Sequence, residues 1–347
     1  MTVVRTVTEL VGNTPLFELA RTPSGTRLLL KLEQFNPTGA AKIRMAQAMI
    51  RDAEQRGLLR PGGHIIESTS GNTGLGLAVV AAERGYRFTA VVDHHASADK
   101  LRAMRAMGAE LVYVGDDDGL ATSAREDLAE AMAAECPGAF FTEQHNNDAN
   151  PVGYYPVADE LLAALGSVDV LIGAVGTGGS LFGTARRLRS HGCAPHVIGV
   201  EPVGSVAFGG EGGPYWQSGT GTPPGATVGT AVDYALLNEG MKVGDVPAFA
   251  TARALAVRLG LLIGGSAGGS VYAALERLSG FPPGSTVVVI VCDGGEKYLD
   301  TIFDDEWMLE RDLYCRDTEH RVLGLLDDYP THQPTQPDED CELAEVG

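Results

Sequence analysis

A lysine set among small residues is the first feature of this sequence that could do chemistry. Lys42 follows Gly39, Ala40 and Ala41 at the predicted start of a helix, in the stretch NPTGAAKIR (36–44). Because no bulky neighbour covers its stem, a flat molecule could come close to its amine. The ordinary alternative is a solvated lysine in the first turn of an amphipathic helix, and the rest of the chain must decide between the two.

Two glycine-rich turns each follow a predicted strand and precede a predicted helix. The first, TSGNTG (69–74), follows HIIES, and the second, GTGGS (176–180), follows VDVLIGAV. Helix N-termini present unpaired N–H groups and a positive dipole end, and glycine lets the backbone wrap closely round an anion. One such turn alone often only joins a strand to a helix. Two of them together with Lys42 indicate a ligand that has two anionic ends and an aldehyde.

A third glycine cluster, GGSAGG (264–269), opens another predicted helix and carries Ser266. Serine is a preferred helix cap, which is the ordinary explanation. In the functional interpretation its hydroxyl faces the ring nitrogen of a heteroaromatic cofactor and donates to it. Other phosphate sites fit less well, since GTGGSLFG lacks the lysine of GxxxxGKS or GxxxxGKT and neither turn has the spacing GxGxxG.

The composition favours a globular protein whose partner is a small molecule. At 347 residues with 44% hydrophobic content, the chain can build one large or two medium cores. A formal net charge of -19 argues against nucleic acid or an anionic membrane, because both repel an acidic surface. No apolar run approaches the roughly 18 residues that span a bilayer, and the first ten residues do not resemble a signal peptide, so we expect a cytoplasmic protein. The five cysteines lack metal-ligand spacing, and we expect no metal site.

Short apolar runs alternate with alanine-rich segments of helical period, a pattern typical of parallel sheets covered by helices. The runs are LLLKLE (28–33), HIIES (64–68), FTAVVD (88–93), AELVYVG (109–115), VDVLIGAVG (168–176), HVIGVEP (196–202) and STVVVIVCD (285–293). They form two clusters, before and after about residue 145, so we predict two α/β lobes with a cleft between them. The irregular segment 209–225 has the length of many functional lids. From about Leu325 the chain is acidic and contains prolines, which predicts a mobile tail.

Taken together, these motifs resemble the cysteine synthase and cystathionine β-synthase family, fold-type II enzymes that depend on pyridoxal 5'-phosphate (PLP). The resemblance runs through VGNTPL (11–16), NPTGAAKIR, ESTSGNTG, EQHNNDANP, GTGGS, GVEP, GGSAGG and CDGGEKYLD (292–300). It implies a two-lobed α/β fold of the tryptophan synthase β type, with parallel-rich sheets covered by helices and a cleft between the lobes. It also implies a homodimer.

The resemblance divides the chain into four parts. Residues 1–38 are expected to pack on the larger lobe, and residues 39–145 to form the smaller lobe with the lysine and the substrate loop. Residues 146–324 are expected to form the larger lobe with the phosphate loop, and residues 325–347 the acidic mobile tail.

The resemblance also implies a role for individual residues. Lys42 matches the lysine that forms the Schiff base with PLP, Asn72 the asparagine that hydrogen-bonds the ring hydroxyl, and Ser266 the serine that faces the pyridine nitrogen. The residues that match the phosphate cradle are Gly176, Thr177, Gly178, Gly179 and Ser180. The residues that match the loop and glutamine gripping the substrate α-carboxylate are Thr69, Ser70, Gly71, Thr73 and Gln144.

The implied reaction is PLP-dependent β-replacement on an activated L-serine, either O-acetylserine or O-phosphoserine, through an aminoacrylate and with a sulfur nucleophile. An amine nucleophile such as glutamate, giving a diaminopropionate precursor, is the alternative within the same chemistry. An elimination of the dehydratase or threonine synthase type fits the TSGNTG and GGSAGG motifs less well.

A non-catalytic homologue is the third possibility. The family usually has Lys-Asp-Arg where this chain has Lys42, Ile43 and Arg44, and the run EQHNND also departs from ordinary cysteine synthases. Against this interpretation, Lys42, Asn72, Ser266 and both glycine turns are all present.

Overall fold

Two sheets organise the chain, which we describe from a computed structural model over residues 3–93, 97–114 and 122–329. The larger sheet has six strands in the order β1 (Leu16–Arg21), β2 (Arg27–Leu32), β10 (Thr286–Val291), β7 (Val170–Ala174), β8 (His196–Pro202) and β9 (Glu239–Val243). The smaller has four in the order β5 (Glu110–Tyr113), β4 (Arg87–Val92), β3 (His64–Ser68) and β6 (Ala139–Phe141). All neighbours are parallel except β1 and β2, and the expected parallel-rich α/β fold is confirmed.

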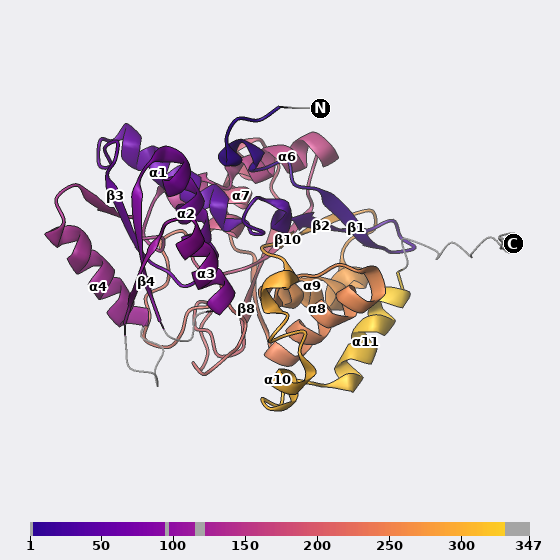
Figure 1. Cartoon of the computed structure of the whole chain (residues 1–347). Helices are drawn as coiled ribbons and strands as arrows, with labels where there is room; N and C mark the ends of the chain where they lie inside the picture. Colours follow the sequence, from indigo (N-terminus) through magenta and orange to yellow (C-terminus); the bar gives the residue numbers. More distant parts are fainter. Residues whose placement is uncertain (1–2, 94–96, 115–121, 330–347) are drawn as a thin grey trace, which may run out of the picture.

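Helices lie on the sheets and between them (Figure 1). They are α1 (Lys42–Gln55), α2 (Asn72–Arg84), α3 (Ala98–Ala106), α4 (Thr122–Glu135), α5 (Ala149–Val152), α6 (Tyr155–Leu165), α7 (Gly179–Ser190), α8 (Asp245–Leu259), α9 (Gly265–Arg277), α10 (Asp305–Leu309) and α11 (Arg316–Asp327). Short 3-10 helices are η1 (Val7–Leu10), η2 (Glu33–Phe35), η3 (Leu278–Gly280) and η4 (Gly295–Tyr298).

The central strand β10 explains why its sequence is a continuous apolar run. Successive strand side chains point to opposite faces of a sheet. Val287 and Val289 therefore pack in one core with α8 and α9, while Val288 and Ile290 pack in the opposite core with α6 and α7. Both faces are covered, so no polar position is needed.

Helix α1 connects the cores of the two sheets. Its Met45 and Met49 pack with residues of the six-stranded sheet, whereas Ala46 and Ile50 pack with residues of the four-stranded sheet. The N-terminus of α1, where Lys42 stands, therefore lies at the junction of the two halves of the molecule. The finer division at residues 38, 145 and 324 stays a prediction.

The start of the predicted tail is helical. Helix α11 continues through Leu325 and Leu326 to Asp327, and Leu326 is buried in the same core as Val322 one turn earlier. The acidic composition of this region led us to overlook Val322 and Leu326, which are four residues apart and therefore lie on one face of a helix. Residues 330–347 of the predicted tail lie outside the described residues.

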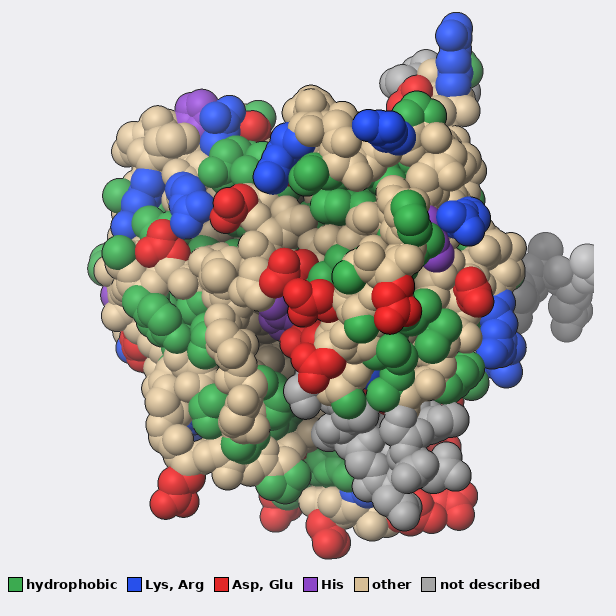
Figure 2. All heavy atoms as spheres, turned by 90° about the vertical axis from the view of Figure 1, so that its left-hand side faces the viewer, with side chains coloured by type: hydrophobic (Ala, Val, Ile, Leu, Met, Phe, Trp, Pro, Cys, Tyr) green, Lys and Arg blue, Asp and Glu red, His purple; other side chains and the backbone are tan. Residues whose placement is uncertain are grey.

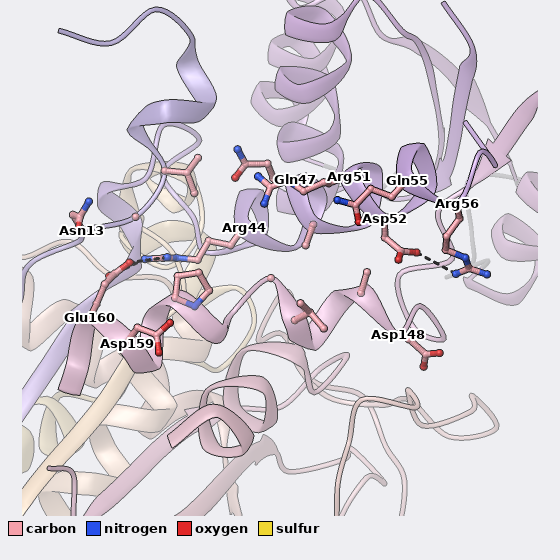
Figure 3. Close-up of a pocket in the computed structure, with 17 residues that line it drawn as sticks. Asn13, Arg44, Gln47, Arg51, Asp52, Gln55, Arg56, Asp148, Asp159 and Glu160 are labelled. Atoms are coloured by element: carbon pink, nitrogen blue, oxygen red, sulfur yellow. Dashed lines mark hydrogen bonds and ion pairs between the residues drawn. The ribbon is translucent and has the colours of Figure 1, made fainter. Parts of the chain in front are cut away.

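Arg44, two residues after Lys42, ties three elements together. Its guanidinium donates to both carboxylate oxygens of Glu33, at 2.6 and 2.9 Å, and to Glu160 at 2.9 and 3.0 Å. Lys31 reaches the same Glu160 carboxylate at 2.5 Å. Figure 3 shows the Arg44–Glu160 pair in a pocket of about 700 Å³ between α1 and the α5–α6 segment. Both carboxylates hold the pKa of Arg44 above its usual range although burial lowers it.

Replacing Arg44 with methionine should be strongly destabilising, because it leaves the wholly buried Glu33 carboxylate without its main partner. Loss of one partner from a buried ion pair costs about 3 to 5 kcal/mol of unfolding free energy. The matched control is Arg56→Met, which breaks an exposed pair with Asp52 and should cost less than about 1 kcal/mol. Urea unfolding measures both, and equal losses for the two variants would contradict the structural role of Arg44.

Candidate active site

Lys42 lies beside the second glycine turn. Its Nζ is 3.5 Å from Thr177 Oγ1. Burial lowers the pKa of Lys42, and the opposing effects of Cys292, Glu67 and Asp293 do not restore it to the usual value. A larger share of the amine is therefore unprotonated at neutral pH, which is the form needed for attack on a carbonyl or for removal of a proton.

The second glycine turn, GTGGS, follows β7 and opens α7, as predicted. Gly178 has a φ of +89°, and a Cβ there would come within 2.6 Å of the Val232 backbone nitrogen. A Cβ on Gly176 would come within 2.9 Å of the Gly219 carbonyl oxygen. Both positions therefore exclude a side chain. The first N–H groups of a helix such as α7 have no partner within the helix, so an anion can bind there. With Lys42 alongside, this cradle fits a phosphate ester that carries an aldehyde.

The long segment between β8 and β9 forms a wall beside this cradle. Thr220 Oγ1 and Gly221 N both donate to the Val175 carbonyl oxygen, at 2.9 and 2.7 Å. The Asp245 carboxylate accepts from Trp216 N at 2.8 Å. The predicted lid at 209–225 is thus anchored at Trp216–Gly221, because its backbone polar groups are paired with the strand end and with α8.

The first glycine turn, between β3 and α2, brings the predicted carboxylate-binding residues together. Thr73 Oγ1 donates to Gln144 Oε1 at 2.7 Å, and Thr69 Oγ1 accepts from Gly74 N at 3.2 Å. Gly71 caps α2 and has open space around it.

Ser70 in the same turn is held by an ion pair. Its hydroxyl donates to Asp93 Oδ2 at 3.1 Å and accepts from Arg125 Nη1 at 2.7 Å. Arg125 also pairs with Asp93 at 2.5 Å. A carboxylate that binds Ser70 must therefore replace one of these existing partners. Arg125 lies next to this loop, and sequence analysis did not single it out.

Glu67 is a further residue that sequence analysis missed. It lies in β3 with 2% of its surface exposed and accepts from Thr142 Oγ1 and, at 3.2 Å, from Gln144 N. Burial raises the pKa of Glu67 to about 7, although these hydrogen bonds lower it. The available signal in the sequence was an acidic residue inside HIIES, a run predicted to be a buried strand. The hydrogen bonds of Glu67 hold Gln144, the predicted substrate-binding glutamine, in position.

Asn72 opens α2, but both ends of its carboxamide are engaged. Its Nδ2 donates to Asp293 Oδ2 at 2.8 Å, and its Oδ1 accepts from Lys297 Nζ at 2.7 Å. Burial lowers the pKa of Lys297 to about 8. A ring hydroxyl at Asn72 would compete with these two residues of the CDGGEKYLD motif, neither of which was predicted as a site residue.

The remaining predicted residues lie around the same strand ends. Ser266 is buried in the first turn of α9, after Gly264, whose N–H donates to the Asp293 carbonyl oxygen at 3.1 Å. Burial raises the pKa of the thiol of Cys292, the residue before Asp293, to about 12, although Ser180 lowers it. The strand-end turn after β10 therefore contacts both Asn72 and the start of α9.

The altered residue Ile43 points into the core. It is fully buried, and the α1 backbone at Ile43 comes so close to α2 that a Cβ on Gly76 would lie 3.0 Å from the Ile43 Cα. The residue that raised the possibility of a non-catalytic homologue is therefore a buried residue at the contact between α1 and α2.

Acidic side chains are prominent on the face shown in Figure 2, in keeping with the net charge of -19. Over the ranges 3–93, 97–114 and 122–329, the structure holds no helix long and apolar enough to cross a membrane. Within the same ranges no three His, Cys, Asp or Glu side chains are grouped to hold a metal ion.

Comparisons with known proteins agree with this geometry. The family model described as pyridoxal-phosphate dependent enzyme matches residues 7–293. A protein of Sinorhizobium fredii whose name marks it as a candidate cysteine synthase is 52% identical over 312 residues, covering 89% of this chain and 93% of its own. An O-acetylserine dependent cystathionine β-synthase of Bacillus subtilis is 35% identical and covers 86% and 97% of the two chains. The crystal structure of an O-ureido-L-serine synthase matches with a TM-score of 0.80 at 33% identity, covering 89% of this chain and all of its own.

The pKa of Glu67 predicts a pH-dependent stability term. The folded protein keeps the Glu67 proton up to about pH 7, whereas the ordinary pKa is 4.5, so folded protein binds more protons between these values. The stability from this group is fully present below about pH 4.5 and is lost as pH rises through about 7.

Urea unfolding of wild type and Glu67→Gln at a series of pH values tests this prediction. The free energy of unfolding of wild type minus that of the variant should fall as pH rises from about 4.5 and should level off above about pH 7. His145, whose pKa burial lowers to about 4, gives an opposite slope but is present in both proteins and cancels. A flat difference would show that Glu67 titrates normally.

Proposed function

Because this chain belongs to the pyridoxal-phosphate dependent enzymes of the cysteine synthase and cystathionine β-synthase family, we propose that it catalyses β-replacement on an activated L-serine. O-acetylserine or O-phosphoserine is the donor, and a sulfur nucleophile is the acceptor. The observation that carries this proposal is the contact between the Lys42 amine and Thr177 at the start of the anion-binding turn.

PLP, when bound, supplies an aldehyde that condenses with amines and a ring that withdraws electrons from the substrate α-carbon. In our proposal Gly176, Thr177, Gly178, Gly179 and Ser180 hold its phosphate. Asn72 and Ser266 hold its ring, the former after exchange with Asp293 or Lys297. Lys42 would hold the cofactor through its aldehyde, and its amine would be the base for the substrate α-proton, a task suited to its lowered pKa.

We assign the substrate α-carboxylate to the first glycine turn. In this proposal one carboxylate accepts hydrogen bonds from hydroxyl groups and helix N-terminal N–H groups of this turn, which come from Thr69, Ser70, Gly71 and Thr73. Gln144 completes this set, and its backbone and amide are fixed by Glu67. Binding there orients the α-carbon toward Lys42 and keeps water from the reacting atoms.

An amine-class nucleophile is the second candidate. The likeness to an O-ureido-L-serine synthase, whose named product carries oxygen at the β-carbon, supports a nucleophile other than sulfur, while the likeness to an O-acetylserine dependent cystathionine β-synthase supports sulfur. A homodimer and a cytoplasmic location stay predictions.

Mixing the PLP-loaded protein with each activated serine and each nucleophile class, then weighing the products, tests the proposed reaction. We expect a new bond at the serine β-carbon with release of acetate or phosphate. Sulfide, homocysteine and glutamate represent the nucleophiles. Release of pyruvate and ammonia from every mixture, with no β-substituted product, would show elimination and overturn the proposal.

Thr73→Val should weaken substrate use without loss of cofactor. It removes the hydroxyl that joins Gln144 while keeping the side-chain shape. A hydrogen bond to a charged group is worth about 1 to 3 kcal/mol, so kcat/KM for the activated serine should fall roughly 5- to 150-fold. The matched control is Thr89→Val, which removes a buried hydroxyl bonded to His64 away from Lys42. If Thr73→Val lost PLP while Thr89→Val kept it, this turn would bind the cofactor rather than the substrate.

A further inference from the structure

We propose that Asn150 is a positioning residue that locks the phosphate turn to the substrate-binding glutamine. This inference rests on the proposed function, because it takes Thr177 and Gln144 as parts of one site. Asn150 stands in the EQHNNDANP motif but was given no role by sequence analysis.

One nitrogen of Asn150 contacts both halves of the site. Its Nδ2 donates to the Gln144 carbonyl oxygen at 2.7 Å and to Thr177 Oγ1 at 3.0 Å. Thr177 Oγ1 is also the atom that lies 3.5 Å from Lys42 Nζ. A single carboxamide thus fixes the residue at each end of the expected ligand.

The hydrogen bond from Asn150 orients the hydroxyl of Thr177. A hydroxyl has two acceptor lone pairs and one hydrogen. Asn150 Nδ2 donates to Thr177 Oγ1 at 3.0 Å, so it occupies one lone pair and leaves the hydroxyl hydrogen free for an anion in the turn. Without Asn150 the hydroxyl can rotate, and the phosphate loses an oriented donor.

The Asn150 carboxamide is tightly enclosed by its neighbours. Asn150 is completely buried in α5, and a Cβ on Gly179 would fall 1.9 Å from Asn150 Oδ1. A Cβ on Gly153 would fall 2.7 Å from the Arg44 carbonyl oxygen, and one on Gly183 would fall 2.2 Å from the Pro151 carbonyl oxygen. Helix α5 is therefore wedged between α1, which carries Lys42, and α7, which begins in the phosphate turn.

An ordinary buried asparagine that only satisfies a backbone carbonyl is the competing interpretation. It accounts for the bond to Gln144 but not for the second bond to the Thr177 hydroxyl. The two interpretations differ in what Asn150→Ala should change: stability alone, or stability together with PLP affinity and substrate KM.

The test compares Asn150→Ala with Asn147→Ala, a control in the same segment whose side chain bonds the Thr142 carbonyl and the Ala149 N–H. PLP affinity is measured by equilibrium dialysis of cofactor-free protein, and KM for the activated serine is measured at saturating PLP. We expect Asn150→Ala to lower the PLP affinity and to raise the KM, each by about 3- to 30-fold, the range for one or two lost hydrogen bonds. For Asn147→Ala both quantities should stay within about twofold of wild type.

Asn150→Asp serves as a second variant of equal size in case alanine prevents folding. It replaces the donor with an acceptor beside the phosphate turn, so PLP affinity should fall at least as far as in the alanine variant. PLP affinity and KM that match those of Asn147→Ala in both Asn150 variants would overturn the proposal. If wild type turned over no activated serine, the proposed function would fail, while dialysis would still decide the role of Asn150.

Discussion

The approach of Lys42 to Thr177 is the constraint on which the rest of the site depends. It requires α1 to start at the junction of two sheets, with methionines facing one core and Ala46 and Ile50 facing the other. It also requires the turn GTGGS to pack closely against the backbone at Gly219 and Val232, which the glycines at 176 and 178 allow. Arg44 then holds the first turn of α1 to Glu33 and Glu160, so the lysine is fixed by buried ion pairs rather than by its own contacts.

Burial shifts the charges of the site toward neutral forms. It lowers the pKa of Lys42, Lys297 and His145 and raises that of Glu67. A neutral amine can attack an aldehyde, and a protonated Glu67 adds no repulsion next to Gln144, the expected carboxylate ligand. Helix N-termini with backbone N–H groups then supply the attraction for an anionic cofactor.

Local sequence patterns predicted most strands and both glycine turns, because strand alternation and turn chemistry depend on near neighbours. HIIES and HVIGVEP coincide with β3 and β8. Glu67, Asp293 and Asn150 escaped prediction because their roles come from partners far along the chain, such as Asn72 with Asp293 across 221 positions. The helical start of the predicted tail was missed for a different reason: composition outweighed the single apolar pair that orders it.

The most direct measurement is reductive trapping of PLP with borohydride, followed by trypsin digestion and mass spectrometry. Our account predicts that the cofactor mass lies on the peptide 32–44, because modified Lys42 resists cleavage and the fragment runs on to Arg44. Lys100 and Lys297 are two other largely buried lysines whose pKa burial lowers. Trapping on either of them, or unmodified Lys42 in fully labelled protein, would contradict the central role of the Lys42–Thr177 contact.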